Sequence, residues 1–292
     1  DFTFVQRQLW ETLQTIFKRH FEGTDFNIYV DSDGLLCHGP QLTWMDAIVN
    51  DEMITPRAGK AVEVQALWYN ALKVMQLLAK KFENGEKATN YAKMAERTRM
   101  SFVDKFWDDQ NRCLFDLIDE EYRDDSLRPN QVIAVSLDFA MLDKTKEERI
   151  VEVVQSQLLT PYGLRTLSQD DPRYRGVYDG DRRIRDMAYH NGAVWPWLLG
   201  PFTTAFLKVK GHSEQSREYA FRSFLVRLLS DQISLCGLGT LNELFDGKPP
   251  HTPRGCIAQA WSVAEPLRAY IEDVLLFRPR HEERILKTCE AS

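Results

Sequence analysis

Apolar residues recur at helical spacing along most of the chain. Residues 59–82 and 86–106 each carry an apolar stripe with steps of three or four residues, which is the spacing of one helical face. Asn84 and Gly85 interrupt the pattern between the two stripes. We therefore expect two long helices that are joined by a short turn and lie antiparallel.

The same pattern continues on both sides of this pair. It predicts further helices over residues 2–21, 129–142, 144–158, 191–209, 213–233 and 256–275. Residues 26–30 could form a short strand and residues 113–119 a hairpin arm, but no convincing sheet is expected. The expected fold class is all-α. A toroid of alternating inner and outer helices is favoured over a helical solenoid, because the loops are irregular rather than periodic.

Three segments lack a helical stripe and carry aromatic and charged residues instead. They are the polar stretch that follows Gln41, the loop over residues 160–190, and the loop over residues 236–255. A compact domain rarely keeps a loop of this length unless the loop serves a site or is disordered. Because aromatic residues and arginines favour order, we expect the three loops to form one functional face of a helical scaffold.

Composition narrows the class of ligand. The chain of 292 residues is 43% hydrophobic and 27% charged, which is ordinary for a globular protein with a substantial core. Its net charge of −6 argues against nucleic acid and against an anionic membrane surface. No apolar run long enough to span a bilayer and no signal-peptide pattern occurs. A neutral polar ligand suits this balance best.

Cysteine and histidine usage suggests neither a disulfide framework nor a metal site. The five cysteines are scattered and form no C-x-x-C pair, and the six histidines lack metal-ligand spacing. No nucleotide-binding glycine motif occurs either. We therefore expect no cofactor and no metal. A reducing compartment, the cytoplasm, is the simplest interpretation of the cysteines.

Asp46 is the first candidate for chemistry. It follows Trp44 and Met45 directly, and such neighbours would partly desolvate a carboxyl group, raise its pKa and suit it to act as a general acid. An aspartate at the first turn of a helix, facing the helix dipole, is the structural alternative. The adjacent tryptophan favours the functional interpretation.

A second acidic segment contains Glu243 and Asp246 and is followed by a turn rich in proline and glycine. Spacing alone does not decide between the two, and either could simply pair with Arg254. Two separated carboxylates, one acid and one base, are the minimum equipment for hydrolysis of a glycosidic bond. In inverting enzymes they stand roughly 6.5–9.5 Å apart, which leaves room for a water molecule.

Aromatic residues near the loops are typical of a sugar site. Four tryptophans lie close to loop–helix junctions: Trp44, Trp195, Trp197 and Trp261. Indole rings pack against the C–H faces of sugars, although a large aromatic is more often part of a core. His190 could bind a sugar hydroxyl or satisfy a buried polar group. Arg57 could orient a hydroxyl or neutralise Glu63.

Six motifs taken together resemble a known family. They are QLTWMDA, TPRAGKAVEVQALWYNAL, LRPNQVIAVSL, TPYGLRTL, RDMAYHNGAVWPWLLGPF and LNELFDG with the following PRGCIAQAWSVAE. In this order, from about Asp33 to Arg268, the set resembles the C-terminal glucosidase domain of glycogen debranching enzymes, the amylo-α-1,6-glucosidase family.

The resemblance implies an (α/α)6 toroid and inverting hydrolysis of α-1,6-linked glucose stubs on a glycogen-like glucan or limit dextrin. Asp46 then matches the general acid and Glu243, rather than Asp246, the general base. Four further residues lie in matching motifs and are expected to line the glucose subsite, namely Trp44, Arg57, His190 and Trp195. Together with Asp46 and Glu243 they make up the predicted site.

Residues 1–292 are expected to form a single catalytic domain of this kind. About eight helices are predicted where the resemblance implies twelve, and the chain begins with Asp1, so it is expected to be a piece of a longer polypeptide with helices missing at its N-terminus. Asn191 departs from the family pattern. Two alternatives stay open, namely a trehalase or other glucosidase of the same toroidal clan, and a non-catalytic glucan-binding module.

Overall fold

The fold of the protein is mixed rather than all-α. The computed structural model describes residues 1–83 and 85–277, so Asn84 and Cys289 lie outside the described residues. Helices make up 53% of the structure and strands 13%, and the strands form several antiparallel sheets. The prediction of an all-α (α/α)6 toroid is therefore wrong. Strands of two or three residues are too short to leave a periodic signal in the sequence.

The helical part closely follows the apolar stripes. Its elements are α1 (Phe2–Phe4), the π-helical η1 (Val5–Leu9), α2 (Trp10–Glu22), α3 (Val62–Phe82), α4 (Gly85–Phe106), α5 (Gln131–Ser136), α6 (Lys144–Gln157), α7 (Arg182–Tyr189), the 3-10 segment η3 (Pro196–Leu198), α8 (Leu199–Lys210), α9 (Glu214–Ala220), η4 (Phe221–Leu225), η5 (Leu228–Gln232), α10 (Ile233–Leu235), α11 (Ala260–Ala269) and η6 (Tyr270–Val274). A short 3-10 turn, η2 (Asp25–Asn27), follows α2.

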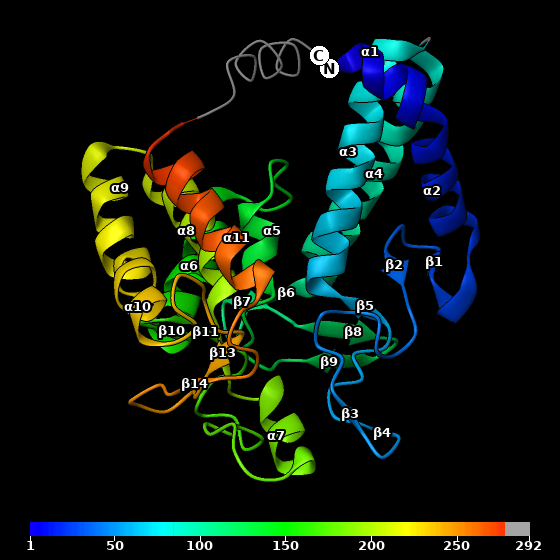
Figure 1. The fold of residues 1–292 in the computed structure, drawn as a ribbon. Helices are drawn as coiled ribbons and strands as arrows, with labels where there is room; N and C mark the ends of the chain where they lie inside the picture. Colours follow the sequence, from blue (N-terminus) through cyan, green and yellow to red (C-terminus); the bar gives the residue numbers. More distant parts are fainter. Residues whose placement is uncertain (84, 278–292) are drawn as a thin grey trace.

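Helix packing forms the core. As predicted, α3 and α4 lie side by side, and α3 also packs against α5, α5 against α8, and α8 against α11 (Figure 1). The buried stripe of α3 includes Ala66, Leu72 and Ala79, which are almost inaccessible to solvent. Burial of such side chains stabilises the fold by roughly 25 cal/mol for each Å² of apolar surface removed from water.

Short strands gather at one end of the helices (Figure 1). They are β1 (Tyr29–Val30), β2 (Leu36–Cys37), β3 (Ile48–Val49), β4 (Glu52–Met53), β5 (Lys60–Ala61), β6 (Trp107–Asp108), β7 (Cys113–Leu114), β8 (Leu117–Asp119), β9 (Tyr122–Asp124), β10 (Leu159–Thr160), β11 (Gly163–Arg165), β12 (Val194–Trp195), β13 (Leu244–Phe245) and β14 (Pro253–Arg254). The described strands pair as β1–β2, β3–β4, β6–β7, β5–β8–β9 and β10–β11–β12–β13–β14.

The five-stranded sheet joins two loops that are far apart in the sequence. Val194 of β12 pairs with Phe245 of β13, and Leu244 of β13 pairs with Arg254 of β14. The sheet thereby places the residues that follow α7 beside the segment that contains Glu243. A sheet at this position was not predicted, and it determines where the second carboxylate lies.

Two predicted boundaries differ from the structure for local reasons. The helix expected over residues 191–209 begins only at Pro196, because Val194 and Trp195 are hydrogen-bonded into the sheet. The loop expected over residues 160–190 contains a helix, α7, whose N-cap Asp181 accepts a hydrogen bond from the Ile184 amide. The mostly polar sequence of α7 carries little apolar stripe, since much of this helix is exposed.

In the part of the chain that the structure describes, no helix combines the length and the hydrophobicity needed to cross a membrane. The cysteines at positions 37, 113, 236 and 256 are all free thiols. A cytoplasmic location stays a prediction.

Candidate active site

A tightly anchored loop presents Asp46. Met45 is fully buried, and its carbonyl oxygen accepts a hydrogen bond from the Thr55 hydroxyl at 3.2 Å. The Trp44 indole Nε1 donates to Asn130 Oδ1 at 2.8 Å. The next side chain, Asp46, points outward and is 60% exposed. The two apolar neighbours therefore serve as anchors, and they leave the carboxylate free to meet a ligand.

A buried ionic network supports this loop from below. The Arg57 guanidinium forms a forked pair with Glu63 and donates through Nε to Asp116 Oδ2 at 2.8 Å. Its Nη1 also donates to Thr43 Oγ1 at 3.0 Å. Asp116 in turn accepts from the Asn130 amide at 2.7 Å. Thr43, the residue before Trp44, is thus tied to the same buried charges.

The described hydrogen bonds of the Arg57 guanidinium all go to other residues of the chain. Its side chain is only 4% exposed, and the partner expected from the sequence, Glu63, is the one it has. Direct binding of a sugar hydroxyl by Arg57 stays a prediction, whereas support of the Thr43–Asp46 loop is what the geometry provides.

Aromatic rings form a wall around Trp44. Its ring lies edge-on to those of His190, Trp195, Trp197 and Trp261, with centroids 5.2, 5.5, 5.1 and 6.3 Å away. Edge-to-face packing of this kind is the favoured arrangement of aromatic pairs. Four residues singled out from the sequence, Trp44, Trp195, Trp197 and Trp261, therefore come together with His190 in one cluster.

His190 lies inside this cluster and faces Asp46. Its ring stacks on Trp195 at 5.5 Å and is fully buried, and its Nε2 stands 3.7 Å from Asp46 Oδ1. Neither ring nitrogen has a hydrogen-bond partner among the described residues. Burial lowers the pKa of His190, which favours the neutral imidazole. The neutral ring thus packs among the aromatic rings and faces Asp46 from the interior.

The expectation for the pKa of Asp46 is wrong. The His190 imidazole holds the pKa of Asp46 below its ordinary value, and desolvation opposes this only in part because the side chain is largely exposed. The expectation assumed that Trp44 and Met45 cover the carboxyl group. In an extended loop, however, successive side chains point to opposite sides, so neighbours in sequence need not cover one another.

Glu243 is held on both carboxylate oxygens. Oε1 accepts a hydrogen bond from the Tyr189 hydroxyl, and Oε2 accepts one from the Cys256 amide at 2.8 Å. Gly255 lies so close that a Cβ atom there would stand 2.4 Å from Oε2, and its φ of +66° is a backbone angle that glycine adopts easily. Turn geometry at Gly255 therefore makes room for the Glu243 carboxylate.

The competing carboxylate, Asp246, is occupied. It is buried, accepts the Tyr178 amide at 2.7 Å and the Arg254 Nε at 3.2 Å, and forms an ion pair with Arg254. Glu243, by contrast, faces Tyr189 and the aromatic cluster. Asp246 serves the ion pair with Arg254, whereas Glu243 is half-buried beside Tyr189, and a catalytic role for Glu243 stays a prediction.

Tyr189, Arg128 and Asn130 are site residues that the sequence reasoning did not single out. Arg128 is buried, and its Nη1 donates to the His190 carbonyl at 2.6 Å and to the Thr166 carbonyl at 3.1 Å. All three lie in motifs that carry the family resemblance, namely LRPNQVIAVSL and RDMAYHNG. Their position in these motifs was the signal in the sequence that could have identified them as site residues.

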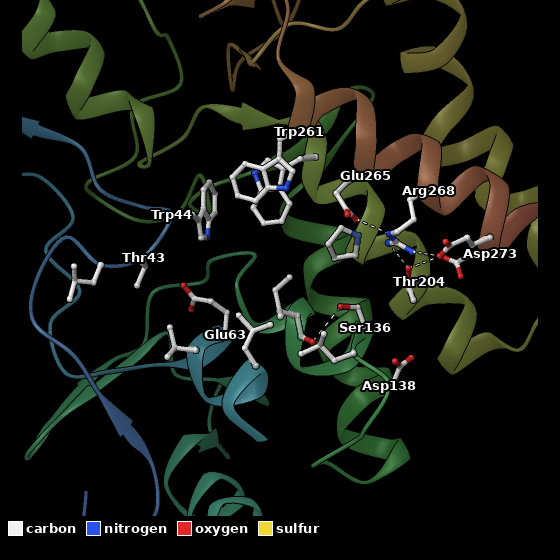
Figure 2. A pocket seen from close by; sticks show the side chains of 18 residues that line it. Thr43, Trp44, Glu63, Ser136, Asp138, Thr204, Trp261, Glu265, Arg268 and Asp273 are labelled. Atoms are coloured by element: carbon white, nitrogen blue, oxygen red, sulfur yellow. Dashed lines mark hydrogen bonds and ion pairs between the residues drawn. The ribbon is translucent and has the colours of Figure 1, made fainter. Parts of the chain in front are cut away.

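A cavity of about 680 Å³ adjoins the cluster (Figure 2). Trp44, Trp197 and Trp261 line one end of it, and Thr204 and Arg268 line the other. Asp46, His190 and Glu243 are not among its lining residues. Trp44 therefore lines the cavity and also contacts His190, the residue that faces Asp46.

Two buried imidazoles predict that stability depends on pH. Burial lowers the pKa of His38 as well as that of His190. Below about pH 6.5 the unfolded chain binds protons that the folded imidazoles refuse, so each group costs up to about 1.4 kcal/mol of unfolding free energy per pH unit. The contribution of the neutral, buried imidazoles to the unfolding free energy is fully present above about pH 6.5 and is lost as the pH falls below it.

We expect urea unfolding, followed by tryptophan fluorescence, to give a lower unfolding free energy at pH 5.5 than at pH 7.5. The variant His38→Asn should lose part of this difference, since one titrating group is gone. An equal pH dependence in the variant and the wild type would contradict the assignment.

The chain is similar to one protein family and to individual proteins of known sequence or structure. The family described as amylo-alpha-1,6-glucosidase matches residues 1–268. A glycogen debranching enzyme of Saccharomyces cerevisiae is 27% identical over 230 residues, covering 63% of this chain and 15% of the yeast protein. A solved sialidase shares the fold with a TM-score of 0.68 at 15% identity, covering 96% of this chain and 25% of that one. The chain thus spans a small part of the length of these proteins.

Proposed function

Because the chain belongs to the amylo-alpha-1,6-glucosidase family, we propose that it is an inverting exo-glycoside hydrolase that releases glucose from α-1,6 branch stubs of glycogen-like glucans. The activity, the substrate and the inverting outcome are all part of this proposal. A branched α-glucan is the partner, and the wall of aromatic rings is the surface against which its terminal glucose packs.

One observation carries the proposal: two carboxylates nearly two hundred positions apart approach the same pair of neighbouring residues. Asp46 stands 3.7 Å from the ring of His190, and Glu243 accepts a hydrogen bond from Tyr189. The negative charge of Asp46 also acts on the Tyr189 hydroxyl and contributes to its raised pKa, after burial and the contacts with Glu243. These contacts support the proposal that both acids belong to one site.

In the proposed mechanism, Asp46 is the general acid. It protonates the glycosidic oxygen as the bond to the anomeric carbon breaks. In the free protein the pKa of Asp46 is lowered by His190, so the ionised form is favoured. A glucose ring bound over Asp46 excludes water and disfavours the charged form, which raises the pKa of the carboxyl group towards the value that an acid needs.

Glu243 is the general base of this mechanism. It accepts a proton from a water molecule that attacks the anomeric carbon on the face opposite the leaving group. The hydrogen bonds from Tyr189 and from the Cys256 amide are made to the carboxylate oxygens and fix their orientation. His190 and Trp195 lie behind the glucose subsite, where the buried His190 ring faces Asp46.

The anomeric form of the first product tests the proposal. The wild-type protein, incubated with panose or a limit dextrin and followed by proton NMR from the first minutes, is expected to release β-glucose, which then mutarotates. Release of α-glucose would contradict inversion. Saturable binding of the glucan without any release of glucose would instead point to a glucan-binding module, and hydrolysis of trehalose in preference to panose would change the substrate.

A further inference from the structure

Tyr189 stands at the junction of the two carboxylates. It is the last residue of α7, and its ring packs against Trp195 at 4.9 Å and His190 at 4.6 Å. Its hydroxyl donates a hydrogen bond to Glu243 Oε1. The next residue, His190, faces Asp46. Two consecutive residues thus reach one carboxylate each.

The backbone of this dipeptide is fixed from both sides. The Tyr189 carbonyl accepts a hydrogen bond from Trp195 Nε1 at 3.0 Å, and the His190 carbonyl accepts one from Arg128 at 2.6 Å. Arg128 also donates to Asn191 Oδ1 at 3.0 Å. Since Arg128 is buried, these bonds are sheltered from water. The Tyr189 hydroxyl is therefore held by a rigid frame.

Glu243 has little freedom to move away from this hydroxyl. Its other oxygen is bound by the Cys256 amide at 2.8 Å, and Gly255 lies directly against the carboxylate. The Cys256 amide donates to one oxygen and the Tyr189 phenol to the other, and the Cys256 thiol also lies beside the carboxylate. Removal of the phenol takes away the described donor to Oε1 and leaves that oxygen less well oriented.

We propose that Tyr189 is a positioning residue for Glu243, and that the Tyr189–His190 dipeptide sets the placement of Glu243 relative to Asp46. The kinetic part of this inference rests on the proposed function. Tyr189 transfers no proton to substrate in this scheme. It acts by aiming the Glu243 carboxylate at the position of the attacking water, where a misplacement of about 1 Å can cost about 10²-fold in rate.

Tyr189→Phe tests the inference, because phenylalanine keeps the ring packing and removes only the hydroxyl. We expect kcat on panose to fall by about 10–100-fold while KM changes less than about threefold, since substrate contacts are retained. Tyr162→Phe is the matched control. Tyr162 packs on Phe245 at 5.0 Å, on the same sheet, and has no contact with Glu243 among its described interactions. Full turnover by Tyr189→Phe, or equal losses in both variants, would overturn the inference.

A second readout does not need activity. In protein labelled with ¹³C at the tyrosine Cζ, the resonance missing from Tyr189→Phe identifies Tyr189. That resonance should move in Glu243→Gln, which weakens the acceptor, and stay in place in Asp51→Asn, which changes an exposed carboxylate in the turn between β3 and β4. If the chemical shift of the Tyr189 Cζ resonance is the same in Glu243→Gln as in the wild type, the positioning role is overturned.

The two readouts also separate the two proposals. A wild type without glucosidase activity would refute the proposed function, and the NMR comparison would still decide whether Tyr189 holds Glu243. An active wild type whose Tyr189→Phe variant keeps its kcat would leave the proposed function intact and refute the inference.

Discussion

Asp46→Asn is expected to lower kcat for release of glucose by about 10²–10⁴-fold, the range that a positioned general acid supplies. Asparagine has nearly the same shape but cannot give a proton to the glycosidic oxygen. Because the Asp46 side chain is 60% exposed and stands 3.7 Å from its nearest ionisable partner, the substitution should leave the fold intact. The measurement is steady-state kinetics on panose, with thermal unfolding by circular dichroism to verify the fold.

Asp51→Asn is the control for this prediction. Asp51 is an exposed aspartate in the turn between β3 and β4, a few residues away on the same loop. The control should turn over panose as the wild type does, because the Asp51 side chain is exposed and has no described contact with the aromatic cluster. Near-full turnover by Asp46→Asn would remove Asp46 from the mechanism.

Arg57→Met carries the largest expected loss of stability. The substitution leaves Glu63 and Asp116 buried without their shared cation, and removal of one partner from a buried ion pair costs about 3–5 kcal/mol. Methionine fills much of the volume of the arginine stem, so the loss is due mainly to charge. The midpoint of urea unfolding should fall accordingly.

A double substitution isolates the cause. Arg57→Met combined with Glu63→Gln removes one of the stranded charges and should recover part of the lost stability, whereas an additive loss would mean that packing dominates. If the unfolding free energy of Arg57→Met lies within about 1 kcal/mol of the wild-type value, the network contributes little to stability.

Helices and chemistry were predictable to different extents. The stripes over residues 59–82 and 86–106 predicted α3 and α4 well, because one face of each helix is buried. The motifs predicted the family, which is confirmed by the match over residues 1–268. The all-α class was wrong, because strands such as β12 and β13 are fixed by pairing between distant segments rather than by local pattern.

The candidate site shows the same division. The sequence named Asp46 and Glu243 as possible partners, and its two alternatives for Arg57 included the pairing with Glu63 that the structure contains. It did not single out Tyr189, although this residue lies in a family motif, because its contact with Glu243 depends on where the segment next to β13 lies. The pKa of Asp46 was misjudged because sequence neighbours were taken for spatial cover, and the catalytic roles themselves stay predictions.

Arg128 binds both halves of the site at once. Its guanidinium contacts the Met45 sulfur at 3.9 Å on one loop and the His190 carbonyl at 2.6 Å on the other. A displacement of the Met45 loop would therefore also strain the contact of Arg128 with His190, because one buried cation contacts both. Exposed segments around the site can accordingly vary in sequence while Met45 and His190 keep their relative placement through Arg128.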